Sequence, residues 1–153
     1  MNKKNPQPIM VAGDFTKRHL FGQGDILAHQ INACTSSSHG LGRVLENSYS
    51  YGSMYSKKVT KDNILADNLL RPVGECTLLH DKHPNNPHVA NIVGQFFYGR
   101  SIDDRGRQED YMSKFSDKCS PIFIQQLRQD TKANRVKWFH EALDSLYRTL
   151  KDK

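Results

Sequence analysis

The amino-acid sequence predicts an α/β protein, in which a mixed β-sheet carries helices on its faces. Several short apolar runs have the length of buried strands and end in turns that contain glycine or asparagine. These runs alternate with segments whose apolar residues recur at helical spacing. Such alternation is typical of helices packed on a sheet. A glycine-rich loop joins one predicted strand to one predicted helix, which marks the place where a ligand is expected.

The first predicted elements are two strands and a helix. Residues 9–12 form an apolar run that ends at Gly13-Asp14, which predicts a buried strand and a turn. A second, mostly apolar run over 26–34 predicts another strand. It leads into a polar loop over 35–42, and apolar residues at helical spacing begin within that loop. This stretch therefore predicts a strand, a glycine-rich loop and a helix in succession.

The middle of the chain continues the alternation. We expect a helix over 60–70 that is closed by Pro72. Strands are expected over 74–79 and over 88–97, and the prolines and asparagines between them favour a turn.

The last part of the chain is predicted to be helical. The charged stretch 103–130 predicts about one helix and a loop, broken at Pro121. The clearest amphipathic helix follows, with Asn134 or Asp130 available as its cap. Its apolar residues alternate between spacings of three and four; they are Val136, Phe139, Leu143, Leu146 and Leu150.

Length and cysteine usage narrow the class of protein. A chain of 153 residues fits a single domain, with residues 7–153 globular and 1–6 a flexible amino terminus. No stretch approaches the about 18 consecutive apolar residues of a membrane span, so no membrane partner is expected. The 3 cysteines are widely spaced and form no Cys-x-x-Cys pair, which indicates reduced thiols. We therefore expect an intracellular protein, in the cytoplasm or the nucleus.

The net charge favours an anionic partner. Lys and Arg number 22 against 16 Asp and Glu, which gives a formal net charge of +6. A nucleotide, a nucleic acid or an acidic protein would suit this balance. The basic residues are spread along the chain, and a solvated surface is the simpler interpretation.

The loop Ser38-His39-Gly40-Leu41-Gly42 is the predicted phosphate site. Backbone N–H groups at the start of a helix are unpaired, and the helix dipole favours an anion there. Glycine allows close approach because it has no Cβ. The loop lacks the Lys-Ser/Thr of a P-loop and the third glycine of a dinucleotide-binding fold. The alternative interpretation is an ordinary tight turn between strand and helix.

The order of these pieces resembles that of macro domains, and especially the short bacterial and phage-type members that process ADP-ribose 1″-phosphate. Each matching fragment is short, and the resemblance rests on their number and order, from about Pro8 to the carboxyl terminus. The fragments are Gly13-Asp14-Phe15-Thr16, 26–32, Gly40-Leu41-Gly42, Met54-Tyr55, 70–79, 89–95, Tyr98-Gly99-Arg100, Asp110-Tyr111 and Glu141-Ala142-Leu143.

The resemblance implies a macro-like three-layer sandwich that binds ADP-ribose or an ADP-ribosylated substrate. It also implies hydrolysis at the distal ribose, of a 1″-phosphate or an ADP-ribosyl link, with Asn32 and His39 as catalytic candidates. A non-catalytic ADP-ribose reader and a basic nucleic-acid-binding protein are the alternatives. The implied ligand-binding residues are Asp14, Phe15, Asn32, Ser38, Gly40, Leu41, Gly42, Gln95 and Phe96.

Each main candidate also has a simpler structural interpretation. Asp14 would accept the adenine amino group, since a carboxylate suits an N–H donor, or it would merely cap a turn. Asp25 is its rival, but it lies too close to Asn32 in sequence. Asn32 would contact the distal ribose or satisfy backbone groups at a strand end. His39 would be a general acid or base or face solvent, whereas His29 is expected to be a buried core residue.

The chain departs from the macro pattern. It stops at Lys153, before the second glycine-rich loop and the final strand of that family, and unpaired sheet edges make a homodimer a further expectation. Arg43 and Thr35 replace a small or aliphatic residue and an asparagine of the usual pattern. Relatives that form a covalent intermediate carry a lysine after the fourth strand; Gly94-Gln95 stands there, so lysine chemistry is not expected.

No cofactor and no metal are expected. His80, His83 and His88 are the one histidine group that invites a metal hypothesis. They lie across turn prolines, and no carboxylate or cysteine completes a fitting ligand set.

Overall fold

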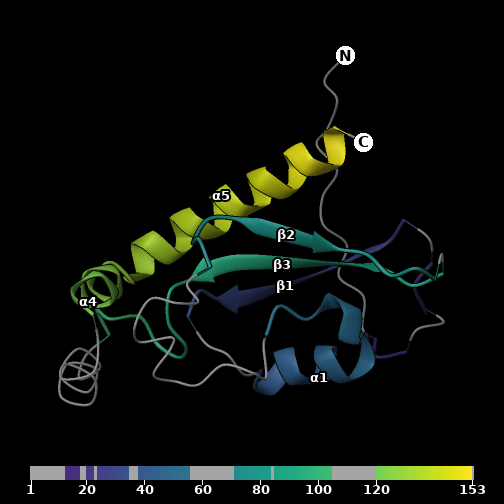
Figure 1. Cartoon of the computed structure of the whole chain (residues 1–153), viewed down its shortest axis with the longest axis horizontal. Helices are drawn as coiled ribbons and strands as arrows, with labels where there is room; N and C mark the ends of the chain where they lie inside the picture. The colour runs from purple at the N-terminus through teal and green to yellow at the C-terminus, as the bar shows by residue number, and fades with distance from the viewer. Residues whose placement is uncertain are drawn as a thin grey trace.

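The computed structural model describes residues 13–17, 20–22, 24–34, 38–55, 71–83, 85–104 and 120–152. Within these residues the chain forms a three-stranded mixed sheet with helices on both faces (Figure 1). The predicted α/β class, a mixed sheet with helices, is therefore confirmed. In chain order the elements are β1 (Ile26–Asn32), α1 (Gly40–Ser48), the 3₁₀ helix η2 (Ser50–Gly52), β2 (Cys76–Leu79), β3 (His88–Gln95), α4 (Pro121–Arg128) and α5 (Lys132–Lys151).

The strand β3 lies at the centre of the sheet. It runs parallel to β1 and antiparallel to β2. The β1–β3 register pairs Ile31 with Val93 and then shifts, so that Asn32 pairs with Gln95. Such an irregularity changes the direction of the side chains at a strand end. Because parallel strands end at the same edge, Asn32 and Gln95 lie side by side at the carboxyl-terminal edge of the sheet.

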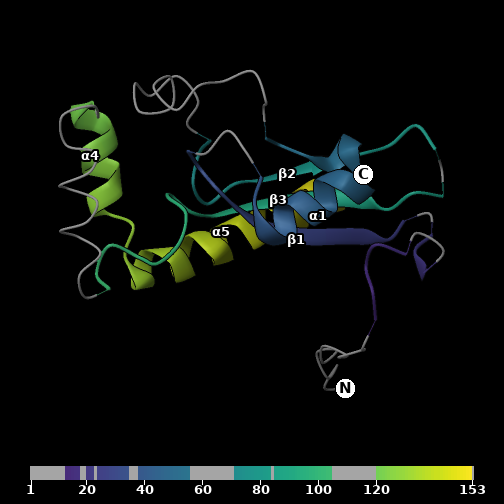
Figure 2. The ribbon, with the colours of Figure 1, turned by 90° about the horizontal axis from the view of Figure 1, so that it is seen from below.

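Helices α1 and α5 lie on opposite faces of the sheet (Figures 1 and 2). On the α1 face, buried Leu45 and Tyr49 pack with Val89 of β3. On the other face, α5 contacts β3 and β2 and buries Trp138 and Ala142.

The buried Asn91 connects β3 to two other elements. Its Oδ1 lies 2.7 Å from His29 Nε2 on β1, and its Nδ2 donates to the Gly52 carbonyl of η2 at 2.9 Å. Glycine is needed in η2, because a Cβ at Gly52 would lie 2.5 Å from Val89 Cγ2. His29 is buried, as the sequence predicted.

The helix boundaries near the carboxyl terminus correct two predictions. Pro121 begins α4 instead of breaking a helix, because the first helical position needs no N–H donor. Ser120 caps this helix, and its Oγ accepts from the Phe123 N–H at 3.1 Å. Neither Asn134 nor Asp130 caps α5. Thr131 does, with its Oγ1 accepting from the Asn134 N–H at 3.2 Å.

The buried face of α5 also differs from the predicted one. Val136 and Leu143 are 60% and 37% exposed, whereas Trp138 and Ala142 are buried. Residues four apart share one face of a helix. The buried stripe of α5 is thus centred on one large ring and one small side chain. Of the predicted apolar residues, only Phe139 and Leu146 are half-buried.

Two predicted elements, the strand over 9–12 and the helix over 60–70, lie outside the described residues, as does most of the charged stretch that precedes α4.

Candidate functional site

A cavity of about 220 Å³ opens at the carboxyl-terminal edge of the sheet, beside the start of α1. This is where α/β sheets place ligands, in the crevice beyond the strand ends. Five of the predicted site residues meet there, together with three residues that the prediction missed and one core residue. The lining residues are Gln30, Ile31, Asn32, His39, Leu41, Gly42, Tyr55, Gln95 and Tyr98.

The first turn of α1 provides the wall that can bind an anion. His39 is the N-cap residue in extended conformation, and its side chain makes no capping hydrogen bond. Gly40 has a φ of +52°, a left-handed conformation that glycine adopts without strain. No acidic side chain occupies the first turn. The Gly42 N–H donates to the His39 carbonyl at 3.1 Å. A negative ligand at this position would therefore meet the N–H groups of Gly40 and Leu41 and the positive end of the helix dipole.

Gly42 keeps this wall open. A Cβ built on Gly42 would meet Tyr55 Cε2 at 3.5 Å and Ser38 Cβ at 3.8 Å, which are ordinary contact distances. Gly42 has no positive φ. An alanine would thus fit the fold, but its methyl group would occupy space between α1 and the Tyr55 ring.

Asn32 supplies a carboxamide at the end of β1. It is 7% exposed, and its Oδ1 accepts from the Cys34 N–H at 3.3 Å. Its carbonyl accepts from Arg71 Nη1 at 3.4 Å. The local contact with Cys34 is the backbone-satisfying role that the sequence left open, and Asn32 nevertheless lines the cavity.

Tyr55, on which Arg71 packs, forms a second wall that sequence reasoning did not assign to the site. The Arg71 guanidinium lies 5.2 Å from the centre of the Tyr55 ring, and Arg71 Nη2 donates to the Met54 carbonyl. Burial raises the pKa of the Tyr55 hydroxyl, against the opposing effect of the Arg71 charge. Tyr55 therefore stays a neutral hydroxyl group near neutral pH. The Met54-Tyr55 fragment of the macro resemblance was the available signal for it.

Gln95 is positioned by side chains from β1 and α5. Its Oε1 accepts from Gln30 Nε2 at 3.1 Å and from Arg135 Nη1 at 3.5 Å. The Gln30 side chain lies against Gly94, where a Cβ would come within 3.1 Å of Cδ. The two glutamines thus form a pair of carboxamides across the β1–β3 boundary.

A buried ion pair fixes the segment that follows β3. Asp130 is fully buried, and its carboxylate accepts from the N–H groups of Phe96 and Phe97 at 3.3 and 3.1 Å. Arg135 donates to both Asp130 oxygens, at 2.8 and 2.7 Å, and to the Gly99 carbonyl at 2.7 Å. We call this Asp130–Arg135 pair the clasp. It fixes the backbone on both sides of Tyr98, whose side chain lines the cavity.

Other predicted residues lie away from the cavity. Asp14 is exposed and caps a turn: its Oδ1 accepts from the Thr16 N–H at 3.0 Å and from its hydroxyl at 2.6 Å, which lowers the pKa of the carboxyl group. Phe15 packs against the cluster that contains Val89. Val89 precedes Gln95 by six residues in β3, about 20 Å along a strand. The structure thus does not bring Asp14 or Phe15 to Asn32.

Three further candidate residues do not line the cavity at the start of α1. Asp25 immediately precedes β1, and its Oδ2 accepts from the Gly22 N–H at 2.8 Å. Ser38 is buried and donates to Glu46 Oε2. Phe96 is buried in the core, with its ring centre 5.2 Å from that of Phe123, and it lines a different cavity.

The histidines at the other end of the sheet form a pair. The Nδ1 atoms of His80 and His88 share a hydrogen bond, while His83 Nδ1 accepts from the Asn85 N–H at 3.3 Å. Among the described residues, no group of three or more His, Cys, Asp or Glu side chains could hold a metal ion. Within the same part of the chain, no helix combines the length and apolar character needed to cross a bilayer.

Comparison with known proteins adds no relative to this picture. No protein-family model, no curated protein and no solved structure matches the chain. The function must therefore be argued from the cavity at the start of α1 and from the residues that surround it.

Proposed function

We propose that this chain binds ADP-ribose or a close derivative, with a sugar-phosphate part of the ligand in the cavity at the start of α1. The observation that carries the proposal is that Asn32, His39, Gly42 and Gln95, which come from three separate parts of the chain, line one cavity. The same proposal includes the resemblance to macro domains. It also includes a macro-like sandwich as the finer description of the fold.

The composition of the cavity supports a phosphorylated sugar. The first turn of α1 offers backbone N–H groups and carries no acidic side chain. Carboxamides from Gln30, Asn32 and Gln95 can both donate to and accept from ribose hydroxyls. A cavity of about 220 Å³ is smaller than the about 300–1,000 Å³ of typical small-molecule sites, so it suits one end of a larger ligand.

Hydrolysis at the distal ribose is the reaction that these residues support. The His39 imidazole is exposed and lines the cavity together with the Asn32 carboxamide, and an imidazole is the most common general acid or base in enzymes. With ADP-ribose 1″-phosphate, a water oxygen would bond to phosphorus while the bond from phosphorus to the ribose oxygen breaks. The leaving oxygen would take a proton from His39, and the proton that the attacking water loses would return to His39 through solvent.

Calorimetric titration with ADP-ribose, followed by a phosphate-release assay with ADP-ribose 1″-phosphate, tests both parts of the proposal. We expect saturable binding of ADP-ribose that Gly42→Ala weakens. His39→Ala should slow phosphate release by about 100-fold or more, as expected for loss of a general acid, and should leave ADP-ribose affinity nearly unchanged. His140→Ala is the matched control, because His140 is an exposed histidine on α5.

The possible outcomes separate the alternatives. Binding without turnover would identify a non-catalytic reader. Absence of ADP-ribose binding at millimolar concentration would overturn the proposed function. Equal phosphate release by the wild type and His39→Ala would remove His39 from the chemistry.

A further inference from the structure

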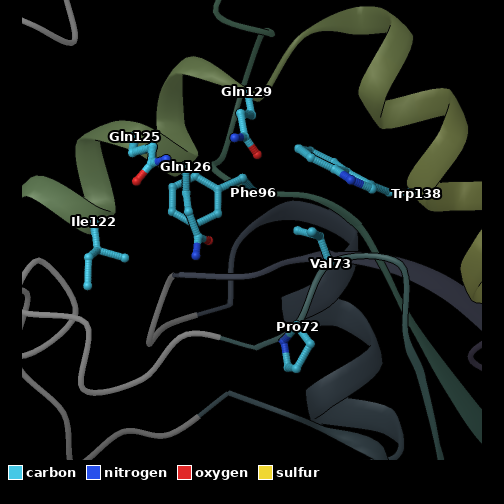
Figure 3. Close-up of a pocket in the computed structure, with 8 residues that line it drawn as sticks. All are labelled: Pro72, Val73, Phe96, Ile122, Gln125, Gln126, Gln129 and Trp138. Carbon is cyan, nitrogen blue, oxygen red and sulfur yellow. The ribbon is translucent and has the colours of Figure 1, made fainter.

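A second and larger cavity, of about 400 Å³, lies between α4, the start of α5 and the segment before β2 (Figure 3). Its volume is within the range of sites that hold a small organic molecule. It is separate from the cavity at the start of α1, and no residue lines both. The lining residues are Pro72, Val73, Phe96, Ile122, Gln125, Gln126, Gln129 and Trp138.

Aromatic, aliphatic and carboxamide side chains line this second cavity, and none of them is charged. Trp138 is 9% exposed and Phe96 only 1%, so Trp138 is the ring with more surface open to a ligand, and Val73 and Ile122 add aliphatic surface. None of the lining side chains is ionisable near neutral pH. A phosphate or a carboxylate would therefore find no cation there, whereas a neutral, flat ligand would bury its faces against apolar groups.

Three glutamines supply the polar groups of the second cavity. Gln125, Gln126 and Gln129 come from α4 and the residue after it, and Gln129 points toward Trp138 across the cavity (Figure 3). Among the described residues, the structure shows no hydrogen bond for these three carboxamides. They are consequently available to a ligand that presents a donor next to an acceptor.

We propose that the second cavity binds a purine base of the adenine type. A carboxamide matches the N6 donor and N7 acceptor of adenine with two hydrogen bonds, and an aromatic side chain provides a surface on which a base can stack. The neutral lining favours the base over the phosphate groups of a nucleotide. This inference does not rest on the proposed function, because it concerns different residues and a ligand part without phosphate.

Trp138 makes the proposal directly testable, because the chain contains a single tryptophan. Titration with adenosine, which carries no phosphate, should give a saturable change in tryptophan fluorescence. Calorimetry on the same samples should give the same dissociation constant. Inosine, in which a carbonyl oxygen replaces the N6 amino donor while N7 remains an acceptor, should bind more weakly.

The variant Gln126→Leu/Gln129→Leu removes two of the three carboxamides while keeping side chains of similar volume. We expect about tenfold weaker adenosine binding or more, the loss typical of one bidentate base contact. Lys137→Leu is the control, since Lys137 is an exposed residue of α5 outside the cavity. Melting curves of both variants establish that they are folded.

Three results would overturn the purine site. These are no binding of adenosine at millimolar concentration, binding by calorimetry without a change at Trp138, or equal affinity in the double glutamine variant. ADP-ribose also carries adenine, so a ligand without a base is needed to separate the two sites. Adenosine binding that persists while ribose 5-phosphate fails to bind would refute the proposed function while supporting this second site.

Discussion

Gly40 and Gly42 are two residues apart at the start of α1, yet glycine has a different role at each position. Gly40 has a φ of +52° and nothing within 4 Å of a built Cβ. Its requirement is conformational. Gly42 lies inside the helix beside Tyr55, and it lines the cavity. Its requirement, in the proposed function, is space for the ligand.

The two alanine variants should therefore behave in opposite ways. Gly40→Ala should lower the free energy of unfolding by about 1–2 kcal/mol, the cost of a left-handed conformation for an L-residue, and retain ADP-ribose affinity. Gly42→Ala should keep or slightly raise stability, because alanine is the better helix former, and should weaken binding. Urea unfolding and calorimetry measure the two quantities. Normal binding by Gly42→Ala would contradict the assignment of the phosphate to this turn.

His29 illustrates how a single buried residue makes stability depend on pH. Burial lowers its pKa from the ordinary value of 6.5, and the neighbouring Asn91 only partly opposes this effect. The Asn91 Nδ2 donates to Gly52, so Asn91 Oδ1 faces His29 Nε2 as an acceptor. The neutral imidazole with hydrogen on Nε2 fits this arrangement.

Acidification should therefore destabilise the protein through His29. Because the pKa of His29 is lower in the folded state, the unfolded chain binds the proton more readily. The contribution of neutral His29 to the free energy of unfolding is therefore complete above about pH 6.5 and is lost as the pH falls below that value. His29→Gln keeps a donor for Asn91 and cannot titrate. In urea unfolding between pH 7.5 and 5, the variant should lose less stability than the wild type. Identical pH profiles would show that His29 is not the titrating group.

At the scale of the elements, the clasp joins the end of β3 to the loop between α4 and α5. Asp130 and Arg135 approach to 2.7 Å, with side chains 0% and 16% exposed. The pair Lys137–Glu141 on the same helix is separated by 3.8 Å, with side chains 68% and 48% exposed. Breaking a buried ion pair lowers the free energy of unfolding more than breaking an exposed one, because a buried carboxylate that loses its partner is not solvated.

Arg135→Leu should lower the free energy of unfolding by about 3–5 kcal/mol, the usual cost of breaking a buried pair. Lys137→Leu should cost about 0–1 kcal/mol. Urea unfolding of the two variants against the wild type provides the comparison. Similar, small losses in both variants would mean that the Phe96 and Phe97 N–H groups alone stabilise the Asp130 carboxylate.

The local elements of the site could be predicted from the sequence because their signals are local. The apolar run of β1 and the glycine-rich loop indicated Asn32, His39, Leu41 and Gly42, whereas Gln95 was implied by the macro resemblance; all five line the cavity. Tyr55 and the Arg71 that packs on it reach the site through long-range packing, for which spacing in sequence gives no signal. Asp14 was placed by the order of fragments, whereas the fold positions its neighbour Phe15 near Val89. Helical periodicity likewise identified α5 but not the face that contacts the sheet, since Trp138 and Ala142 do not follow the leucine pattern.

At the scale of the whole molecule, two cavities lie on either side of the point where β3 ends. Gln95 lines the polar cavity at the start of α1, and the next residue, Phe96, lines the neutral cavity beside α4. Successive residues of an extended chain point in opposite directions. The end of β3 thus serves both cavities, and the clasp fixes the backbone between them through the N–H groups of Phe96 and Phe97.

The central claim is that a sugar-phosphate ligand binds where β1 and β3 end and α1 begins. Backbone amide chemical shifts, recorded by NMR during titration with ADP-ribose, test this claim most directly. We expect the largest changes at Asn32, at residues 40–42 and at Gln95, with Asp14 and Asp25 nearly unchanged. Changes concentrated at Asp14 and Phe15, or no changes at saturating ligand, would contradict the claim.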